Sequence, residues 1–346
     1  MRAIQYRAFH EPLEVVELED PQAPDDGVVI GVHAAGLCRS DWHGWQGHDD
    51  DISVLPHIPG HEFAGVIEQV GSAVRNWQVG DRVTAPFVLG CGACSTCLAG
   101  DSQVCPAQWQ PGFHGPGAFA QRVAVPRADA NLIRLPDDLN MPAAALLGCR
   151  FATGFRAAVV IGRVGPSDDA LVLGCGGLGL SIIMVCAALG ARVTAVDMTP
   201  QALVLAESCG ATATVLAEDQ VALNATLADS ATVSFDATGS IATAQAGVLS
   251  LRPRGRHVQV GLLPTAQTGD RSAIPMGRVI ARELSVLGSH GMPAHDYPAM
   301  LDFIVSRKIE IERIITAQID LASVPAAMAA QPWPPGVTVI DPRHCS

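Results

Sequence analysis

The sequence predicts an α/β protein with two domains, a β-barrel-like domain followed by a doubly wound parallel sheet. Its 346 residues exceed the roughly 100–200 residues of one ordinary domain. Hydrophobic residues make up 49% of the chain and charged residues 16%, so the chain has material for large apolar cores and little for disordered segments. Near residue 170 short apolar stretches give way to alternating strands and helices, which indicates the start of the second domain.

The first part of the chain, residues 1 to about 135, contains short apolar stretches separated by Gly and Pro. The clearest of them are 27–34, 63–70, 81–85 and 119–125. Short strands at this spacing are typical of a β-barrel-like domain with long, irregular loops. Loops of this kind often carry functional residues.

From residue 170 onward, predicted strands and helices alternate. The strands are 170–173, 192–196, 212–216, 233–236, 257–260 and 284–287, and the helices are 178–189 and 200–209. Thr199 at the N-cap, Pro200 at the first helical position and Gly210 after the last turn delimit the second helix. This order predicts a parallel sheet with helices on both faces. Residues after about 290 are expected to return to the first domain.

The charge of the chain argues for a small-molecule partner. A net charge of −12 without a basic cluster makes nucleic acid and anionic membrane surfaces poor partners. Residues 1–20 lack the apolar core of a signal peptide, so a cytoplasmic protein is expected. The uncharged run 170–191 is rich in glycine, which is typical of a buried strand, turn and helix rather than of a membrane span.

A glycine-rich turn lies between the predicted strand at 170–173 and the helix at 178–189. Gly174, Gly176 and Gly179 form the pattern GxGxxG, which permits a tight turn, close approach of a pyrophosphate and close packing of helix on strand. Any glycine-rich turn of an α/β protein gives the same pattern. Asp197 ends the next strand, where an acid binds a ribose 2′-hydroxyl and repels a 2′-phosphate. The two features together predict a dinucleotide site that prefers NAD to NADP, unless Asp197 is merely a solvated carboxylate.

Cysteines form the strongest local motif. Cys91, Cys94, Cys97 and Cys105 lie within 15 residues, among glycines that turn the backbone. Four thiolates at such spacing predict a closed, structural zinc site. The alternative is a pair of disulfides, which needs an oxidising compartment.

A second group of metal-ligand types is dispersed along the sequence: Cys38, His61 with Glu62, and Cys149. Two thiolates and one imidazole would leave zinc with an open fourth position, which a Lewis-acid catalyst needs. Spacing alone does not bring these residues together. A buried cysteine or a hydrogen-bonded core histidine is the competing interpretation of each.

In their order along the chain, these motifs resemble those of the zinc-dependent medium-chain alcohol dehydrogenases, in particular the shorter bacterial members. The matching motifs are Cys-Arg-Ser-Asp at 38–41, Gly-His-Glu at 60–62, the four clustered cysteines, Gly-Cys at 148–149 and the glycine-rich turn at 174–179. The resemblance covers essentially the whole chain. It implies a GroES-like catalytic domain at 1–147, completed by 290–346, and a Rossmann NAD-binding domain at 148–289. It also implies a homotetramer, or failing that a homodimer.

The resemblance implies a role for each matching residue. Cys38, His61 and Cys149 would hold a catalytic zinc, with Glu62 as an occasional ligand, and the four clustered cysteines would hold a second, structural zinc. Ser40 and His43 would form a proton relay. The cofactor would be NAD, bound by Arg39, Thr153, Gly174, Gly176, Gly177, Leu178, Gly179, Asp197, Gly261, Leu262 and Ser289. The substrate pocket would include Phe87, Phe113 and Trp109.

The implied reaction is reversible hydride transfer between a zinc-bound alcohol or alkoxide and NAD, giving an aldehyde or ketone. Polyol enzymes of the family usually have Glu as the third ligand, so Cys149 favours simple alcohols. Ala202 stands where longer animal enzymes have a Lys, which removes one cofactor contact. The remaining cysteines, Cys175, Cys186, Cys209 and Cys345, are interpreted as structural or incidental.

Three rival functions are weaker. An NADPH-dependent aldehyde or ketone reductase of the same superfamily is disfavoured by Asp197. A non-enzymatic nucleotide-binding relative would lack the metal ligands that this chain keeps. A metalloprotease is disfavoured because no second histidine follows His61 and Glu62 at HExxH spacing.

Overall fold

The computed structural model describes residues 1–263 and 274–344. The chain divides into two compact units, which are referred to below as the first and the second unit. The first unit consists of Met1–Ala152, Gly291–Asp302 and Ile315–Ser346. The second unit consists of Thr153–His290 and Phe303–Ile314.

These bounds differ from the predicted ones at two places. The first boundary was expected after residue 147, whereas the units divide within helix α5 (Arg150–Arg156). All of 290–346 was expected in the first domain, whereas 303–314 belong to the second unit. Contacts explain that assignment, because the ring of Phe303 lies 5.3 Å from that of Phe155 and the Arg313 guanidinium donates to the Ser208 carbonyl.

The first unit is built on a seven-stranded sheet. Its strands are β3 (Val28–Gly36), β4 (Phe63–Val70), β5 (Arg82–Thr84), β6 (Arg122–Val125), β7 (Ile133–Arg134), β14 (Ile315–Asp320) and β15 (Val337–Asp341). The order is β14-β15-β3-β4-β5-β7, with β6 also paired to β3, and only β14 and β15 run parallel. A separate hairpin pairs β1 (Arg2–Gln5) with β2 (Glu14–Glu17). Tyr6, Phe63 and Phe119 are among the largest side chains of its buried core.

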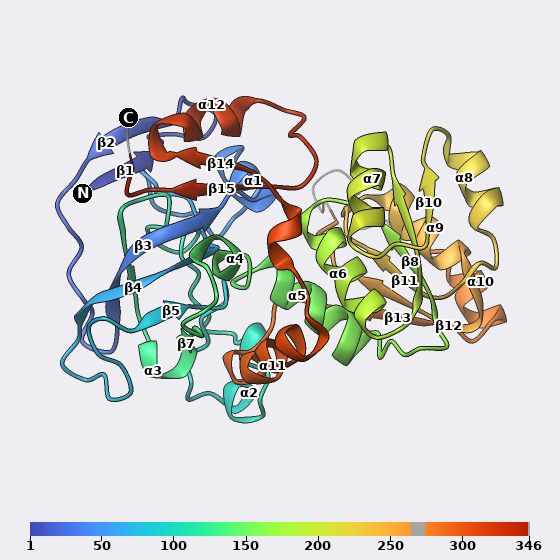
Figure 1. Cartoon of the computed structure of the whole chain (residues 1–346), viewed down its shortest axis with the longest axis horizontal. Coiled ribbons are helices and arrows are strands. Elements are labelled where there is room, and N and C mark those ends of the chain that lie inside the picture. Colours follow the sequence, from blue (N-terminus) through green and yellow to red (C-terminus); the bar gives the residue numbers. More distant parts are fainter. Residues whose placement is uncertain (264–273, 345–346) are drawn as a thin grey trace. The chain divides into compact units, whose positions relative to one another are not determined.

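The first unit also contains several short helices (Figure 1). They are α1 (Arg39–Trp45), α2 (Ser95–Leu98), α3 (Ala128–Asn131), α4 (Met141–Ala145), α12 (Val324–Ala329) and the first half of α11 (Tyr297–Arg307). Long loops separate many of the strands, as the Gly and Pro pattern predicted.

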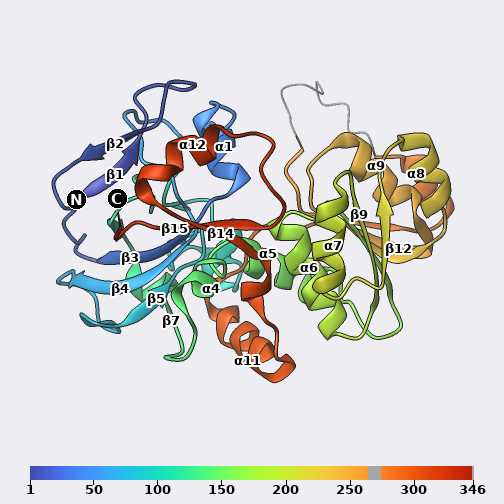
Figure 2. The same ribbon diagram turned by 45° about the horizontal axis from the view of Figure 1, so that its top comes forward.

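The second unit contains a six-stranded sheet in which every strand pair is parallel. The strands are β8 (Asp169–Leu173), β9 (Arg192–Asp197), β10 (Ala213–Leu216), β11 (Ala231–Asp236), β12 (Leu251–Gln259) and β13 (Ser285–Gly288), in the order β10-β9-β8-β11-β12-β13. The helices are α6 (Gly177–Ala188), α7 (Pro200–Ser208), α8 (Gln220–Leu227), α9 (Ile241–Leu249) and α10 (Met276–Ala281) (Figures 1 and 2). The predicted fold class, a doubly wound parallel sheet together with a strand-rich domain, is confirmed.

The strand order indicates where a sheet of this kind binds its ligand. The order reverses between β8 and β11, and ligands of such sheets bind outside the carboxyl ends of the strands at that point. The run 170–191 folds as β8, the glycine-rich turn and α6, as predicted. Within the described residues, the helices are all too short or too polar to cross a membrane.

Candidate functional site

Three dispersed residues meet at one end of the β3–β4 pair. Ala35 on β3 pairs with Phe63 on β4, so the residues just after β3 and just before β4 emerge side by side. Cys38 and His61 occupy these positions, and Cys149 precedes α5. Their ligand atoms, two Sγ and one imidazole nitrogen, all lie within 4.8 Å of one another.

The donors of this group fit a zinc ion. Asp41 is buried, and its Oδ1 accepts a hydrogen bond from His61 Nδ1 at 2.9 Å. Because Nδ1 carries the proton, Nε2 of His61 presents a lone pair, and this buried atom has no hydrogen-bond partner in the described part of the chain. A carboxylate behind a histidine is the usual arrangement around protein-bound zinc. Two thiols and this imidazole form the donor set of an open catalytic site.

Asp41 also organises the surrounding backbone. Its Oδ2 accepts from the Cys38 N–H at 3.1 Å, and its Oδ1 accepts from the Gly60 N–H at 3.0 Å. The carboxylate therefore joins the segments that carry Cys38 and His61. Asp41 belongs to the motif at 38–41, but its role was not predicted from the sequence. The signal that could have revealed it is an acid within one helical turn of a predicted ligand.

Glu62 lies beside the three donors but is engaged elsewhere. Its Oε1 accepts from the Arg150 backbone N–H at 2.9 Å, and its Oε2 pairs with Arg150 Nη2 at 2.8 Å. Arg150 Nη2 also donates to the Leu37 carbonyl at 3.0 Å. Both side chains are buried, and burial raises the pKa of the Glu62 carboxyl to about 7 although Arg150 opposes the shift. The role of Glu62 as an occasional ligand therefore stays a prediction.

The thiols of this site are electrostatically distinct. A hydrogen bond with Cys149, together with the nearby positive charge of Arg150, holds the pKa of the Cys38 thiol well below its usual range. The same hydrogen bond raises the pKa of Cys149, so the first proton leaves the pair from Cys38. A thiolate is the form that binds a metal.

The predicted relay residues lie on α1, directly after Cys38. The Ser40 hydroxyl is 3.9 Å from Cys38 Sγ. His43 is exposed, and its Nδ1 lies 3.1 Å from Nδ1 of His48. Arg39, predicted to contact the cofactor, is exposed at the first position of the helix. The relay and the Arg39 contact stay predictions.

Two of the three predicted pocket residues lie against the histidine of the site. The rings of Phe87 and Phe113 are 6.0 Å and 5.3 Å from the His61 ring. Trp109 also belongs to the first unit. It lines a mostly apolar cavity of about 440 Å³ together with residues such as Ile58.

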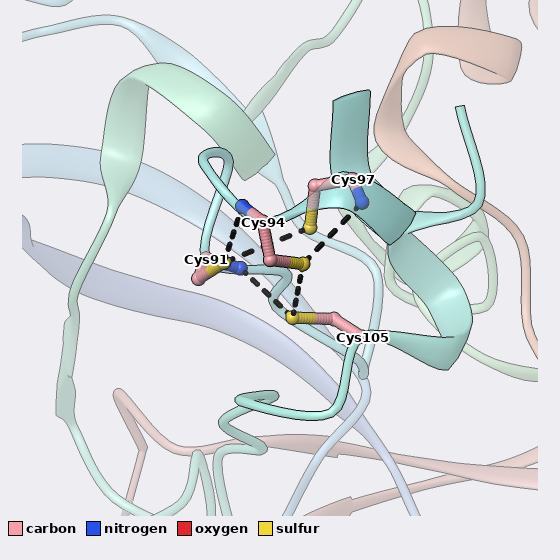
Figure 3. Close-up of side chains that lie close together, drawn as sticks. All are labelled: Cys91, Cys94, Cys97 and Cys105. Carbon is pink, nitrogen blue, oxygen red and sulfur yellow. Dashed lines mark hydrogen bonds between the residues drawn. The ribbon is translucent and has the colours of Figure 1, made fainter. Parts of the chain in front are cut away.

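Figure 3 shows the four clustered cysteines with their side chains turned toward one another. All four are free thiols, and Sγ of Cys94 lies 3.7 Å from Sγ of Cys105, too far for a disulfide bond. Sγ of Cys91 lies 3.9 Å from Sγ of Cys97. A tetrahedron with zinc–sulfur bonds of about 2.3 Å has edges of about 3.8 Å, so these separations fit a structural zinc. Backbone N–H groups of Ala93 and Cys94 lower the pKa of the Cys91 thiol to about 6.

The glycine-rich turn of the second unit has the geometry of a nucleotide site. Gly174 has φ of 94°, which favours glycine, and a Cβ on Gly179 would lie 1.8 Å from the Gly174 carbonyl oxygen. A Cβ on Gly176 would meet no atom within 4 Å, so the backbone there is open to a ligand. Gly177 and Leu178 begin α6, whose N-terminus attracts phosphate.

Asp197 is held at the end of β9, next to that turn. Its Oδ2 accepts from the Cys175 N–H at 2.8 Å, and its Oδ1 accepts from the Thr199 N–H at 2.9 Å. Thr199 is the N-cap residue of α7, as predicted, but its side chain makes no capping hydrogen bond. The backbone thus fixes a carboxylate beside the glycine-rich turn.

Two of the other predicted cofactor residues of the second unit have hydroxyl groups that could bind a ligand. The hydroxyl oxygens of Thr153 and Ser289 are buried and have no hydrogen-bond partner among the described residues. Gly261 packs closely on Gly239, and Leu262 is 76% exposed.

Among the described residues, the remaining cysteines belong to no group of metal ligands. Cys175, Cys186 and Cys209 are buried, and burial raises the pKa of the Cys175 thiol to about 12. Cys345 lies outside the described residues.

Comparison with known proteins agrees with this geometry. The family model described as alcohol dehydrogenase GroES-like domain matches residues 24–137, and the model described as zinc-binding dehydrogenase matches 177–306. An alcohol dehydrogenase of Geobacillus stearothermophilus is 36% identical over 181 residues, or 52% of each chain. This chain thus spans about half the length of the first curated relatives it matches.

Solved structures align over nearly the whole chain. The rspB alcohol dehydrogenase of Escherichia coli CFT073, complexed with NADH, has a TM-score of 0.85 at 26% identity and covers 99% of both chains. A zinc-binding dehydrogenase of Sinorhizobium meliloti 1021, bound to NADP, has a TM-score of 0.87 at 27% identity and the same coverage. The two family models and these full-length likenesses show that the chain belongs to the zinc-type medium-chain dehydrogenase/reductase family.

Proposed function

We propose that this chain is a zinc- and NAD-dependent alcohol dehydrogenase that interconverts an alcohol with an aldehyde or ketone. The observation that carries the proposal is the group of Cys38, His61 and Cys149, in which a buried carboxylate aims a lone pair of His61 at two thiols. The glycine-rich turn and Asp197 supply a dinucleotide site in the same chain. Family relatives described as alcohol dehydrogenases support the reaction class.

In this proposal, zinc supplies Lewis acidity toward the hydroxyl or carbonyl oxygen, and the nicotinamide accepts or donates the hydride. Cys38, His61 and Cys149 hold the metal, and Asp41 fixes the tautomer of His61. The rings of Phe87 and Phe113 keep water from the substrate carbon. The Ser40 hydroxyl accepts the alcohol proton as it gives up its own toward His43, and His43 releases a proton to solvent at the exposed side of α1.

The four clustered cysteines hold a second zinc that stabilises their loop. The thiols of both groups must stay reduced, which supports a cytoplasmic location. We also propose a homotetramer, with a dimer as the alternative, because β13 is an unpaired edge strand of the second sheet among the described residues. Light scattering coupled to size exclusion measures this directly.

The proposal is tested by NADH formation over primary, secondary, aromatic and polyol alcohols, with NAD and NADP compared side by side. We expect turnover of simple alcohols with NAD that a zinc chelator abolishes. Absence of turnover in both directions, by zinc-loaded and folded protein, would contradict the proposal. Faster turnover with NADP would instead favour the reductase alternative, for which the NADP-bound Sinorhizobium meliloti relative is the precedent.

In this proposal, Asp197 determines the preference for NAD over NADP. Replacing Asp197 by Ser is expected to lower the ratio of kcat/KM with NAD to that with NADP about 10- to 100-fold, because a charged hydrogen bond to the ribose contributes about 1.5–3 kcal/mol. Steady-state kinetics with both coenzymes measure the ratio. Asp169→Asn removes a charge at the opposite end of the sheet and serves as the control. An unchanged ratio in Asp197→Ser would mean that another residue reads the ribose.

A further inference from the structure

A row of hydrogen-bonded polar side chains lies inside the second unit and ends at the carboxyl ends of the strands of its sheet. Ser234 and Asp236 come from β11, and His257 and Gln259 from β12. Ser234, Asp236 and His257 are completely buried. The proposed reaction uses none of them, yet polar groups so deep in a core need every partner they have.

The donor and the acceptor of each hydrogen bond in this row of side chains can be assigned. Gln259 Nε2 lies 2.8 Å from Asp236 Oδ2 and 2.7 Å from the Gly261 carbonyl oxygen. Both partners only accept, so the amide nitrogen of Gln259 must face them and its Oε1 must face His257. Oε1 is 3.3 Å from His257 Nε2, which therefore carries the ring proton and donates it.

The hydrogen bonds at the other end of this row, at Ser234, are consistent with that tautomer. His257 Nδ1 is then an acceptor, and the Ser234 hydroxyl, which lies 2.9 Å from both Nδ1 and the Gly247 carbonyl oxygen, shares its one proton between these two acceptors. The Gly247 carbonyl also accepts from the Ser250 hydroxyl at 2.7 Å. Burial lowers the pKa of His257, so the ring is neutral.

At the carboxyl end of β11, Asp236 accepts hydrogen bonds from the turn that follows the strand. Its Oδ1 accepts from the N–H and the hydroxyl of Thr238, both at 2.8 Å, and from the Gly239 N–H at 3.2 Å. Thr238 packs on the glycine-rich turn, since a Cβ on Gly174 would lie 2.4 Å from its methyl carbon. Gly239 packs on the next segment, since a Cβ on Gly261 would lie 2.2 Å from its nitrogen.

We propose that Gln259, oriented by His257, is a positioning residue for the dinucleotide. Its amide clamps the Asp236 turn and the Gly261 carbonyl together, so that two segments beside the glycine-rich turn are in place before the nucleotide binds. Preorganisation of this kind strengthens binding because less order has to be created in the complex. This inference rests on the proposed function only in taking a nicotinamide dinucleotide as the ligand.

The first test replaces Gln259 by Met, which has similar length and no amide. We expect the Kd for NADH, measured by fluorescence with the full-length, zinc-loaded protein, to rise about tenfold, or about 1.4 kcal/mol. The KM for NAD should rise with it while kcat changes much less. The control is Thr232→Val, which removes a partly buried hydroxyl hydrogen bond at the amino end of β11 and should bind NADH as the parent does.

The second test needs neither turnover nor nucleotide. Nitrogen-15 spectra of histidine-labelled protein should show His257 as the Nε2–H tautomer, with His257→Gln identifying the signal.

Parent-like NADH binding by Gln259→Met, or an Nδ1–H tautomer in the parent, would overturn the inference. Both results are independent of alcohol turnover: a parent protein that binds NADH without oxidising any alcohol would contradict the proposed function alone. A parent that binds neither NADH nor NADPH would contradict both.

Discussion

Replacing Arg150 by Met is expected to lower the free energy of unfolding of the first unit by about 3–5 kcal/mol, the usual effect of removing one partner of a buried ion pair. Glu62 would keep its carboxylate in a site without solvent exposure, with only the Arg150 backbone N–H still donating to it. Burial already raises its pKa to about 7 in the presence of the guanidinium, so the site penalises an unpaired charge.

The chain offers a clean probe of this effect. All five tryptophans lie in the first unit, so denaturant titrations followed by tryptophan fluorescence report the unfolding of that unit. The control is Arg343→Met, which breaks an exposed pair with Asp341 and should cost at most about 1 kcal/mol.

A double variant separates charge from packing. Glu62→Gln combined with Arg150→Met removes both charges, and much of the lost stability should return because a neutral pair in a core is often tolerated. If Arg150→Met shifts the unfolding midpoint no more than Arg343→Met does, the ion pair is not what stabilises the wall of the site.

Local signals explain which parts of the fold could be predicted. The strand at 63–70 and the strand–turn–helix at 170–191 were located well because apolar pattern and glycine spacing act over a few residues. Helices α8 and α9 were not predicted, although each has a capping signal. The Asp219 side chain accepts from the Ala222 N–H, and Ser240 accepts from the Thr243 N–H.

The two groups of metal ligands differ in the same way. The four clustered cysteines are close in sequence, so one loop brings them together. Cys38 and His61 meet only because Ala35 pairs with Phe63, a register that no short window of sequence contains. That group was predicted through family resemblance.

Supporting residues were harder to see than ligands. Arg150 follows Cys149 in an apolar stretch, and a lone cation there indicates a buried acidic partner, but the sequence does not say which acid. Gln259 and His257 lie on one strand, and their relation to Asp236 depends on the pairing of β11 with β12. Partners across strands follow from tertiary structure, which local patterns do not encode.

Replacing His61 by Ala is expected to abolish turnover and to lower the zinc content from two ions per chain to one, because the proposed function assigns one ion to each of the two ligand groups. The four clustered cysteines lie apart from His61 in sequence and should keep their metal. Elemental analysis of the purified variant, together with the alcohol assay, measures both effects.

Asp41→Asn provides a graded comparison, since the ligands remain and only the carboxylate behind His61 is lost. Zinc affinity at the catalytic group should fall about 10- to 100-fold, with activity recovering when zinc is added. His57→Gln is the matched control: His57 is also buried, but its Nε2 bonds the Gly112 carbonyl, outside the ligand group. A His61→Ala variant with two zinc ions and the parent rate would remove His61 from the catalytic site, and with it the assignment that the alcohol dehydrogenase proposal needs most.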